Sequence, residues 1–217
     1  MSRFYSRWKK QLIRSKILSG LCKYPGYFRD WRRYSRMEGA EPIRLKDTYP
    51  CLFDKTASTG IDSHYFYQHV WAFEKIIAHR PARHVDVGSH VDFVGMVSAA
   101  APVEFVDIRP MQANNLPNLH STYGSILELP YADRSVESMS CLHVAEHIGL
   151  GRYGDPLDPL GTQKGAAEMA RCLAPGGRLY FSVPVGRPRL CFNAHRIHAP
   201  QQILDYFEGL TLLEFSG

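Results

Sequence analysis

Apolar positions along the chain follow two kinds of spacing from about residue 63 onward. Residues 63–80 place aromatic and aliphatic side chains three or four positions apart, which predicts an amphipathic helix of about four turns. Shorter apolar runs bounded by Gly, Pro or polar residues predict strands. The predicted strands are residues 83–88, 103–108, 135–144, 178–185 and 210–216, and the predicted helices are residues 63–80, 93–101, 161–177 and 199–209.

This alternation of strands and helices predicts one doubly wound α/β sheet with mainly parallel strands. In such a sheet, ligands bind beyond the carboxyl ends of the strands, near the point where the strand order reverses. Functional side chains are therefore expected directly after each predicted strand.

The first 36 residues differ from the rest in charge. They hold eleven Lys or Arg and one acid, whereas the remainder holds 15 basic and 20 acidic residues. Residues 37–62 are interrupted by Gly and Pro and predict an irregular linker. The predicted organisation is a basic, partly helical extension (1–36), a linker (37–62) and an α/β domain (63–217).

Aromatic and aliphatic residues alternate with the cations of the extension, at spacings that suit a helix up to about Gly20. Three interpretations stay open: a helix that packs on its own domain, a helix that binds an anionic membrane surface or a partner protein, and a nucleic-acid arm. Apolar side chains among cations favour lipid over a phosphate-only contact, and no base-reading motif supports nucleic acid.

The five cysteines are scattered and form no CxxC pair, which favours a reducing compartment over a disulfide framework or a zinc site. The apolar runs are too short to span a bilayer, and cations interrupt the start of the chain where a secretory signal would lie. The sequence predicts a cytoplasmic protein, and the basic extension leaves peripheral attachment to the inner membrane surface open.

Candidate ligand-binding residues follow the first two predicted strands. Asp86, Gly88 and Ser89 end the first strand, where a glycine lets the backbone approach a ligand closely. Asp107 ends the second strand, 21 residues after Asp86, where a carboxylate can accept both hydroxyls of a ribose. A tight turn and an exposed loop acid are the structural alternatives.

The middle of the chain resembles class I S-adenosylmethionine-dependent methyltransferases. The matching segments are YGSILELPYADRS (123–135), HVAEHI (143–148) and CLAPGGRLYFSVPVG (172–186). A closer resemblance, to the domain-of-unknown-function 268 (DUF268) family, is indicated by HYFYQHVWA (64–72), DVGSHVDFV (86–94), EHIGLGRYGDPLDPLG (146–161) and FNAHRIHAP (192–200).

This resemblance implies S-adenosylmethionine as the cofactor and assigns its contacts. Asp86, Gly88 and Ser89 match the loop that holds the methionine part, and Asp107 matches the ribose-binding acid. The pair Ser125 and Ile126 matches the residues that flank the adenine. Two positions depart from the superfamily pattern, because His90 and Asp92 stand where glycines are usual.

Three residues at the end of the predicted strand 135–144 and just after it are candidates for catalysis. His143, Glu146 and His147 lie where the methyl group is expected; histidine is the natural base near neutral pH, and a carboxylate can orient it. Capping of the next element is the structural alternative for Glu146 and His147.

Two later segments supply candidate substrate contacts. They are Arg152, Tyr153 and Asp155 in the Gly- and Pro-rich loop 149–161, and His195 and Arg196 after the predicted strand 178–185. The loop is either a wall of the substrate site or an Ω-like structural loop. No third ligand stands near the histidines at a suitable spacing, so we expect no metal.

These features predict a methyltransferase that acts on a small polar or glycan-type acceptor, the glycan preference resting on the resemblance. A methyltransferase-fold binding protein without the reaction and a membrane-surface adaptor are the alternatives. A nicotinamide-dependent enzyme is disfavoured because the first loop lacks G-x-G-x-x-G. The final apolar run, residues 210–216, stands where class I methyltransferases have their sixth strand, so the last strand of the sheet is expected to be missing.

Overall fold

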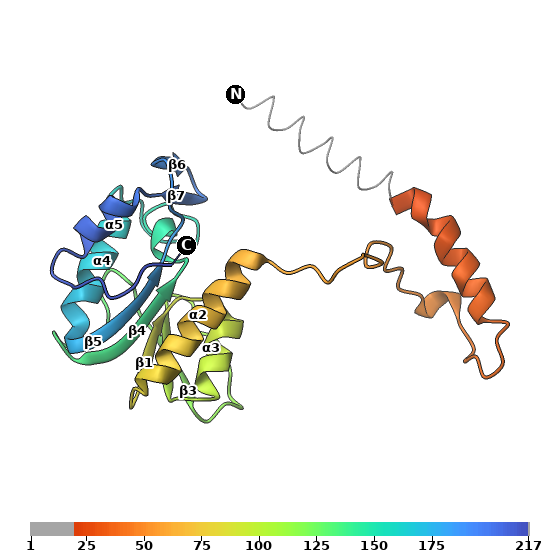
Figure 1. The fold of residues 1–217 in the computed structure, drawn as a ribbon, viewed down its shortest axis with the longest axis horizontal. Helices are drawn as coiled ribbons and strands as arrows, with labels where there is room; N and C mark the ends of the chain where they lie inside the picture. Colours follow the sequence, from red (N-terminus) through yellow and green to blue (C-terminus); the bar gives the residue numbers. More distant parts are fainter. Residues whose placement is uncertain (1–19, 217) are drawn as a thin grey trace. The chain divides into compact units, whose positions relative to one another are not determined.

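A computed structural model describes residues 20–216, which fall into two compact units, Met1–Ile61 and Asp62–Gly217 (Figure 1). In the first unit, residues 20–34 are helical and a short 3-10 helix, η1, spans Leu45–Asp47. The predicted helix end near Gly20 is therefore wrong, because residues 20–34 themselves form more than three helical turns. The part of the predicted helix before residue 20 lies outside the described residues.

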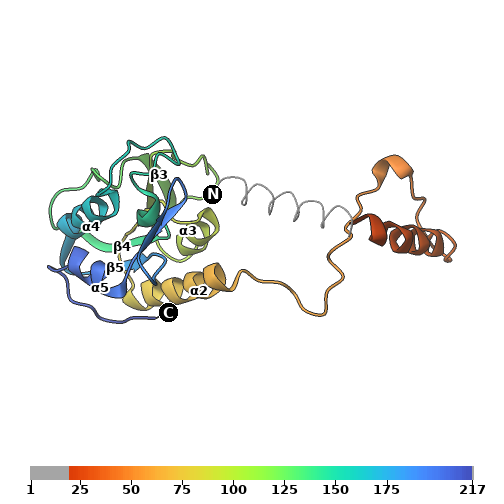
Figure 2. The same ribbon diagram turned by 90° about the horizontal axis from the view of Figure 1, so that it is seen from above.

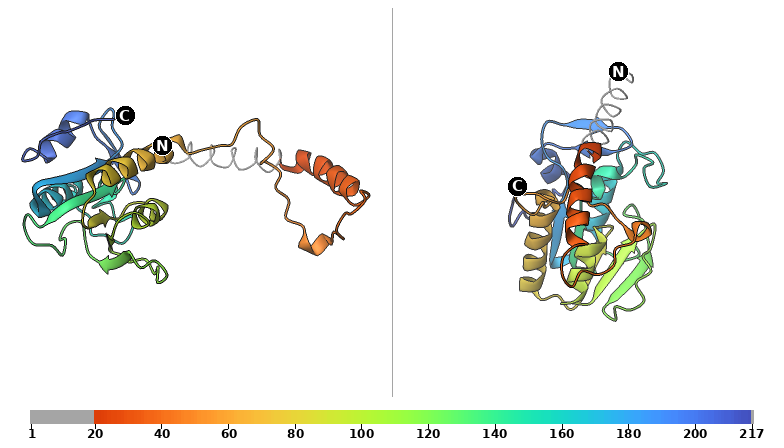
Figure 3. Two further views of the ribbon diagram at one scale, coloured as in Figure 1. Left: turned by 60° about the horizontal axis from the view of Figure 1, so that its bottom comes forward. Right: turned by 90° about the vertical axis from the view of Figure 1, so that its right-hand side faces the viewer.

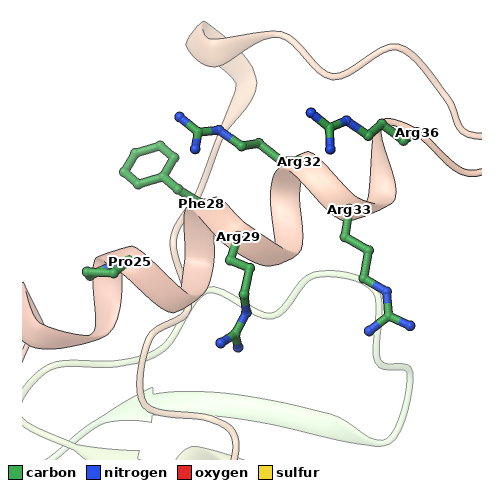
Figure 4. A pocket seen from close by; sticks show the side chains of 6 residues that line it. All are labelled: Pro25, Phe28, Arg29, Arg32, Arg33 and Arg36. Atoms are coloured by element: carbon green, nitrogen blue, oxygen red, sulfur yellow. The ribbon is translucent and has the colours of Figure 1, made fainter.

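The helix at residues 20–34 carries a cationic groove. The groove is lined by Pro25, Phe28, Arg29, Arg32, Arg33 and Arg36. Figure 4 shows Arg32 and Arg36 on one side of the helix and Arg29 and Arg33 on the other. Phe28, on the same side as Arg32, is 40% exposed, so an apolar ring and four guanidinium groups share one short segment.

The second unit contains one five-stranded parallel sheet in the order β3-β2-β1-β4-β5, plus a small antiparallel hairpin. The strands are β1 (His84–Val87), β2 (Val103–Asp107), β3 (Leu119–Tyr123), β4 (Val136–Leu142), β5 (Leu173–Ser182), β6 (Arg189–Cys191) and β7 (His195–Ile197). The helices are α2 (Ser63–His79), α3 (Val91–Ser98), the 3-10 turn η2 (Ala145–His147), α4 (Gly161–Cys172) and α5 (Pro200–Tyr206).

Helices cover both faces of this sheet (Figures 2 and 3). Side chains of α2 and α3 form one apolar cluster with sheet residues such as Val103 and Phe105 of β2. Side chains of α4 and α5 form the other cluster, around Met139 and Met169. The central strand β1 is buried along its whole length, as expected for a parallel strand covered on both sides. The predicted doubly wound fold is therefore confirmed.

Several predicted boundaries need correction. Helix α4 ends at Cys172, and the LAPGG segment that was expected to close it belongs to β5, where the pairing with β4 shifts register. The strand predicted for residues 210–216 is wrong: residues 211–216 have no regular secondary structure. Instead, Glu214 accepts a hydrogen bond from Trp71 and forms an ion pair with Lys75, so side-chain contacts to α2 hold this segment.

Three short strands were not predicted from the sequence. Strand β3 (LHSTY) lies at the sheet edge, where only Leu119 is buried, so it lacks an apolar run. Strands β6 and β7 have three residues each and no buried residue. Within the described part of the chain, no helix combines the length and apolarity needed to cross a bilayer.

A buried polar network joins β1 to β4 below the carboxyl ends of the strands. The two ring nitrogens of His84 lie 2.8 Å from the hydroxyls of Ser138 and Ser140. Ser140 also donates to the carboxylate of Asp86, so its hydroxyl accepts the proton of His84 Nε2, and Ser138 donates to Nδ1. This assignment requires a neutral imidazole. Burial lowers the pKa of His84 to about 3 and raises the pKa of Asp86 to about 6.

We predict that His84 makes the folded state less stable in acid. Below its ordinary pKa of 6.5, the unfolded state binds a proton that the folded state refuses until about pH 3, so stability falls as the pH drops through this window. Between pH 7 and about pH 4.5, protonation of His84 in the unfolded state should lower the free energy of unfolding of the wild type by about 3 kcal/mol. The His84→Gln variant should lack this decrease. Chemical denaturation of the full chain at both pH values measures this difference.

Asp86 acts in the opposite direction, because its raised pKa stabilises the folded state at low pH and this contribution is lost as the pH rises through about 6. Since His84→Gln keeps Asp86, the comparison isolates the histidine. The exposed His120 gives the matched control, His120→Gln, which should leave the pH dependence unchanged. Equal pH dependence in wild type and His84→Gln would contradict the prediction.

Candidate functional site

The carboxyl ends of β1 and β4 lie side by side where the strand order reverses, because the chain runs from β1 outward to β3 and then returns on the other side of β1. The predicted loop after β1 is held from below. The buried Asp86 carboxylate accepts the amide N–H of Ser89 at 2.9 Å, and the Ser89 hydroxyl accepts the amide of Leu142 on β4 at 3.0 Å. Ser89 thus fixes the loop between the two strands.

Gly88 lies at the narrowest part of this loop. Its φ of 69° is in the left-handed region. A Cβ at this position would lie 3.1 Å from Val144 Cγ1 and 3.3 Å from Asp107 Oδ2. The ends of β1, β2 and β4 therefore converge on the backbone of Gly88. The side chain of a larger residue would fill the space between them.

Asp107 is beside that glycine, as its position at the end of β2 predicts. Its Oδ1 accepts the amide of Arg109 at 2.7 Å, which fixes the carboxylate and leaves Oδ2 toward Gly88. The side chain is 17% exposed, so it is reachable by a ligand while being largely desolvated. This pairing of a glycine and a carboxylate fits the hydroxyl groups of a ribose.

The predicted adenine pair serves the local structure. The Ser125 hydroxyl accepts the amide of Leu127 at 3.1 Å. Ile126 is 6% exposed, and a Cβ at Gly165 of α4 would lie 3.2 Å from its side chain. The Ile126 side chain thus fills the core beneath α4.

His90 and Asp92, the two departures from the glycine pattern, begin α3. His90 is the N-cap residue, and its Nδ1 accepts the amide of Asp92 at 3.4 Å. Its ring lies 5.9 Å from the Tyr65 ring and 5.7 Å from the His69 ring, between ring centroids. His90 therefore links the loop after β1 to α2.

The loop after β4 holds a buried carboxylate and a histidine. His143 has a φ of 55°, and its Nδ1 lies 2.9 Å from Glu146 Oε1. Glu146 is 1% exposed, and its Oε2 has no hydrogen-bond partner within the described chain. An acceptor-only carboxylate in this position makes Nδ1 of His143 the protonated nitrogen. The Nε2 of His143 faces the Nε2 of His64 on α2.

His147 belongs to the same turn but faces the hairpin loop. Its Nδ1 donates to the carbonyl of Ala194, and Nε2 lies 3.7 Å from Glu146 Oε1. Burial lowers the pKa of His147, so the ring is neutral near pH 7. Its ring centroid is 6.4 Å from that of His195, which the structure places at the edge of the same region.

Two of the predicted substrate residues hold the loop at 149–161 together. Asp155 accepts the amides of Gly149 at 2.6 Å and Tyr153 at 3.2 Å. Arg196 donates to the carbonyls of Ile148 and Asp158. Their polar groups are engaged in backbone contacts, which supports the Ω-like interpretation for this part of the loop.

Arg152 and Tyr153, by contrast, present side chains at the rim. The guanidinium of Arg152 donates to the carbonyl of Ala194 at 3.2 Å. The Tyr153 ring, 37% exposed, lies 4.4 Å from the guanidinium of Arg109 and 5.0 Å from that of Arg152. The β2 end and the loop after β4 therefore meet above Asp107.

Sequence reasoning missed the contribution of α2. His64 and Tyr65 stand in its first turn, and both rings contact His143, with centroids 4.3 Å and 5.7 Å away. The only signal was the run of polar aromatic residues HYFYQH at the start of a predicted helix. Among the described residues, no group of three or more His, Cys, Asp or Glu is arranged to hold a metal ion.

Comparison with known proteins gives a family and a fold. The model of the family described as Caenorhabditis protein of unknown function, DUF268, matches residues 93–217. No curated protein matches the chain.

Two solved structures resemble the chain at a TM-score of 0.50 and 16% sequence identity. One is the 1,6-didemethyltoxoflavin-N1-methyltransferase of Burkholderia thailandensis, with bound 1,6-didemethyltoxoflavin and S-adenosylhomocysteine; the match covers 68% of this chain and 72% of that one. The other is the [4+2]-cyclase SpnF, for which the match covers 65% of this chain and only 56% of that one. At this identity the likeness concerns the fold. The chain belongs to the DUF268 family and has the fold of the class I S-adenosylmethionine-dependent methyltransferases.

Proposed function

We propose that the chain binds S-adenosylmethionine at the carboxyl ends of β1 and β2 and transfers its methyl group to a small polar or glycan-type acceptor. The observation that carries this proposal is the pairing of Gly88 with Asp107. Gly88 exposes its backbone because it has no side chain. Asp107 provides a fixed, largely desolvated carboxylate oxygen, Oδ2, which lies 3.3 Å from the position that a Cβ at Gly88 would take. A ribose needs such an acceptor for its hydroxyls, and a close approach needs such a glycine.

In this proposal Gly88 and Ser89 border the methionine part and Asp107 accepts the ribose hydroxyls. Ser125 and Ile126 would meet the adenine through backbone groups, since their side chains serve the local structure. The bound cofactor supplies an activated methyl group on a sulfonium, a chemistry that calls for no metal.

The residues of this chain contribute position and proton transfer. The Glu146–His143 pair supports removal of the proton from a hydroxyl substrate, because the buried carboxylate holds the imidazole in one tautomer and stabilises a positive charge on it. His147 is held neutral beside it. Arg152, Tyr153 and His195 form the rim, where a cation, an aromatic ring and a polar ring favour a polar acceptor.

Calorimetry of the full chain with S-adenosylmethionine and S-adenosylhomocysteine tests the cofactor. We expect binding of both, and Asp107→Ala should weaken it at least about tenfold, or about 1.4 kcal/mol, because a charge-assisted contact to the ribose is lost. The exposed Asp205 of α5 provides the control variant Asp205→Ala, which should bind like wild type. No binding, or equal binding by Asp107→Ala, would refute the proposal. Methyl-labelled cofactor offered with a panel of monosaccharides and uronic acids then tests the acceptor class.

A second candidate function, attachment to an anionic membrane surface, is favoured by the groove on residues 20–36. Four arginines and the exposed Phe28 lie within nine residues, at the end of the helix and in the turn that follows it. Cations attract anionic headgroups, and apolar side chains between them can enter the interface. A phosphate-only ligand would gain nothing from the exposed ring.

Co-sedimentation of the full chain with vesicles containing phosphatidylserine tests this attachment. Replacing Arg29, Arg32, Arg33 and Arg36 with Gln should weaken binding about tenfold or more, since each cation near such a surface contributes about 1 kcal/mol. The control replaces the exposed Arg187 and Arg189 of the α/β unit with Gln and should bind like wild type. Equal binding of both variants, or equal binding to phosphatidylcholine vesicles, would count against the second candidate.

A further inference from the structure

His64, in the first turn of α2, covers the Nε2 lone pair of His143. The Nε2 atoms of His64 and His143 are in contact, and the two ring centroids are 4.3 Å apart at an interplanar angle of 70°. The His143 side chain is 8% exposed and that of Glu146 is 2% exposed, whereas His64 is exposed. Solvent and substrates therefore meet His64 before they meet His143.

The positions of the protons follow from counting donors and acceptors. Glu146 Oε1 accepts the Nδ1 proton of His143, so a neutral His143 carries its lone pair on Nε2. The contact between the two Nε2 atoms must then be an N–H···N hydrogen bond with His64 as donor. Neutral imidazole carries one proton, so the lone pair of His64 lies on Nδ1, on the side of its ring away from His143.

We propose that His64 is a catalytic residue that takes the proton of the acceptor and passes charge inward to His143 and Glu146. This inference rests on the proposed methyl transfer. The acceptor oxygen forms its bond to the methyl carbon, the carbon–sulfur bond of the donor breaks, and its electron pair stays on sulfur. The hydroxyl proton goes to His64 Nδ1, the Nε2 proton of His64 moves to His143 Nε2, and the positive charge comes to rest beside the Glu146 carboxylate.

The surroundings of His64 suit this role. Tyr65 packs against the rings of both His64 and His143, with centroids 5.9 Å and 5.7 Å away, which limits the rotation of the two imidazoles. Burial raises the pKa of the Tyr65 phenol, so it stays neutral and does not compete for the proton. After each turnover the exposed His64 can return its proton to water. His143 and Glu146 are positioning residues in this relay, because they act through His64.

Carbethoxylation of the full chain by diethyl pyrocarbonate, followed site by site with mass spectrometry near pH 7, tests the relay without cofactor or acceptor. The reagent attacks an unprotonated imidazole nitrogen, so its rate reports the nucleophilicity and the access of that nitrogen. We expect His64 to react about threefold faster than the exposed His120 of β3, because donation of its Nε2 proton toward the Glu146–His143 pair makes its Nδ1 lone pair more nucleophilic. Glu146→Gln should reduce the rate at His64 to that of His120.

A second variant protects the test from a folding defect in Glu146→Gln. His143→Asn keeps a residue type that tolerates the left-handed backbone at φ 55° and removes the imidazole that accepts from His64. It too should bring the His64 rate down to that of His120, while circular dichroism stays unchanged. A His64 rate no higher than that of His120 in wild type, or unchanged in both variants, would overturn the relay. Failure of cofactor binding in calorimetry would instead overturn the proposed methyl transfer and leave this labelling pattern intact.

Discussion

Burial of the Glu146 carboxylate is the constraint around which the candidate site is built. A carboxylate that is 1% exposed loses its hydration, a cost of several kcal/mol that only nearby donors can offset. His143 supplies one such donor at 2.9 Å, and it can do so because its left-handed backbone turns the ring back toward η2. Removing either partner would leave the other polar group stranded, so geometry and stability are coupled here.

The second buried carboxylate, Asp86, has a different environment and a different role. The Ser140 hydroxyl of β4 and the Ser89 amide of the loop after β1 satisfy it, and burial raises its pKa to about 6. It meets no exposed group; it shapes the loop at Gly88 and links β1 to β4 through Ser140. Glu146 instead contacts the imidazole of His143, which in turn contacts the exposed His64. Asp86 on β1 thus holds the loop at the floor of the site, whereas Glu146, in the turn η2 after the neighbouring strand β4, holds a base.

The sequence could predict what depends on strand order and register. Val87 pairs with Val106, so the residues that follow, Gly88 and Asp107, must be neighbours in a parallel sheet. The contact of His64 with His143 joins residues 79 positions apart through side chains alone, and no periodicity encodes it.

The structural roles of Asp155 and Arg196, which bind backbone groups of the loop 149–161 and its start, could not be predicted from the sequence either. A charged side chain that binds backbone groups of its own loop looks the same in sequence as one that awaits a ligand. Edge strand β3 was missed because it lacks an apolar run. Residues 210–216 were misjudged for the opposite reason, because their apolar run forms no strand and the side chain of Glu214 holds the segment to α2.

The fold alone leaves the chemistry open, since two proteins of this fold that resemble the chain equally well are named as a methyltransferase and as a cyclase. The activity must therefore come from side chains at the strand ends, and the departure at His90 helps to place them. Where a glycine would leave a gap, the His90 ring packs against Tyr65 and His69 of α2. Tyr65 in turn packs against both His64 and His143. The residue that departs from the usual glycine loop thus helps to hold α2 over the candidate site, and the altered loop and the added histidine are parts of one arrangement.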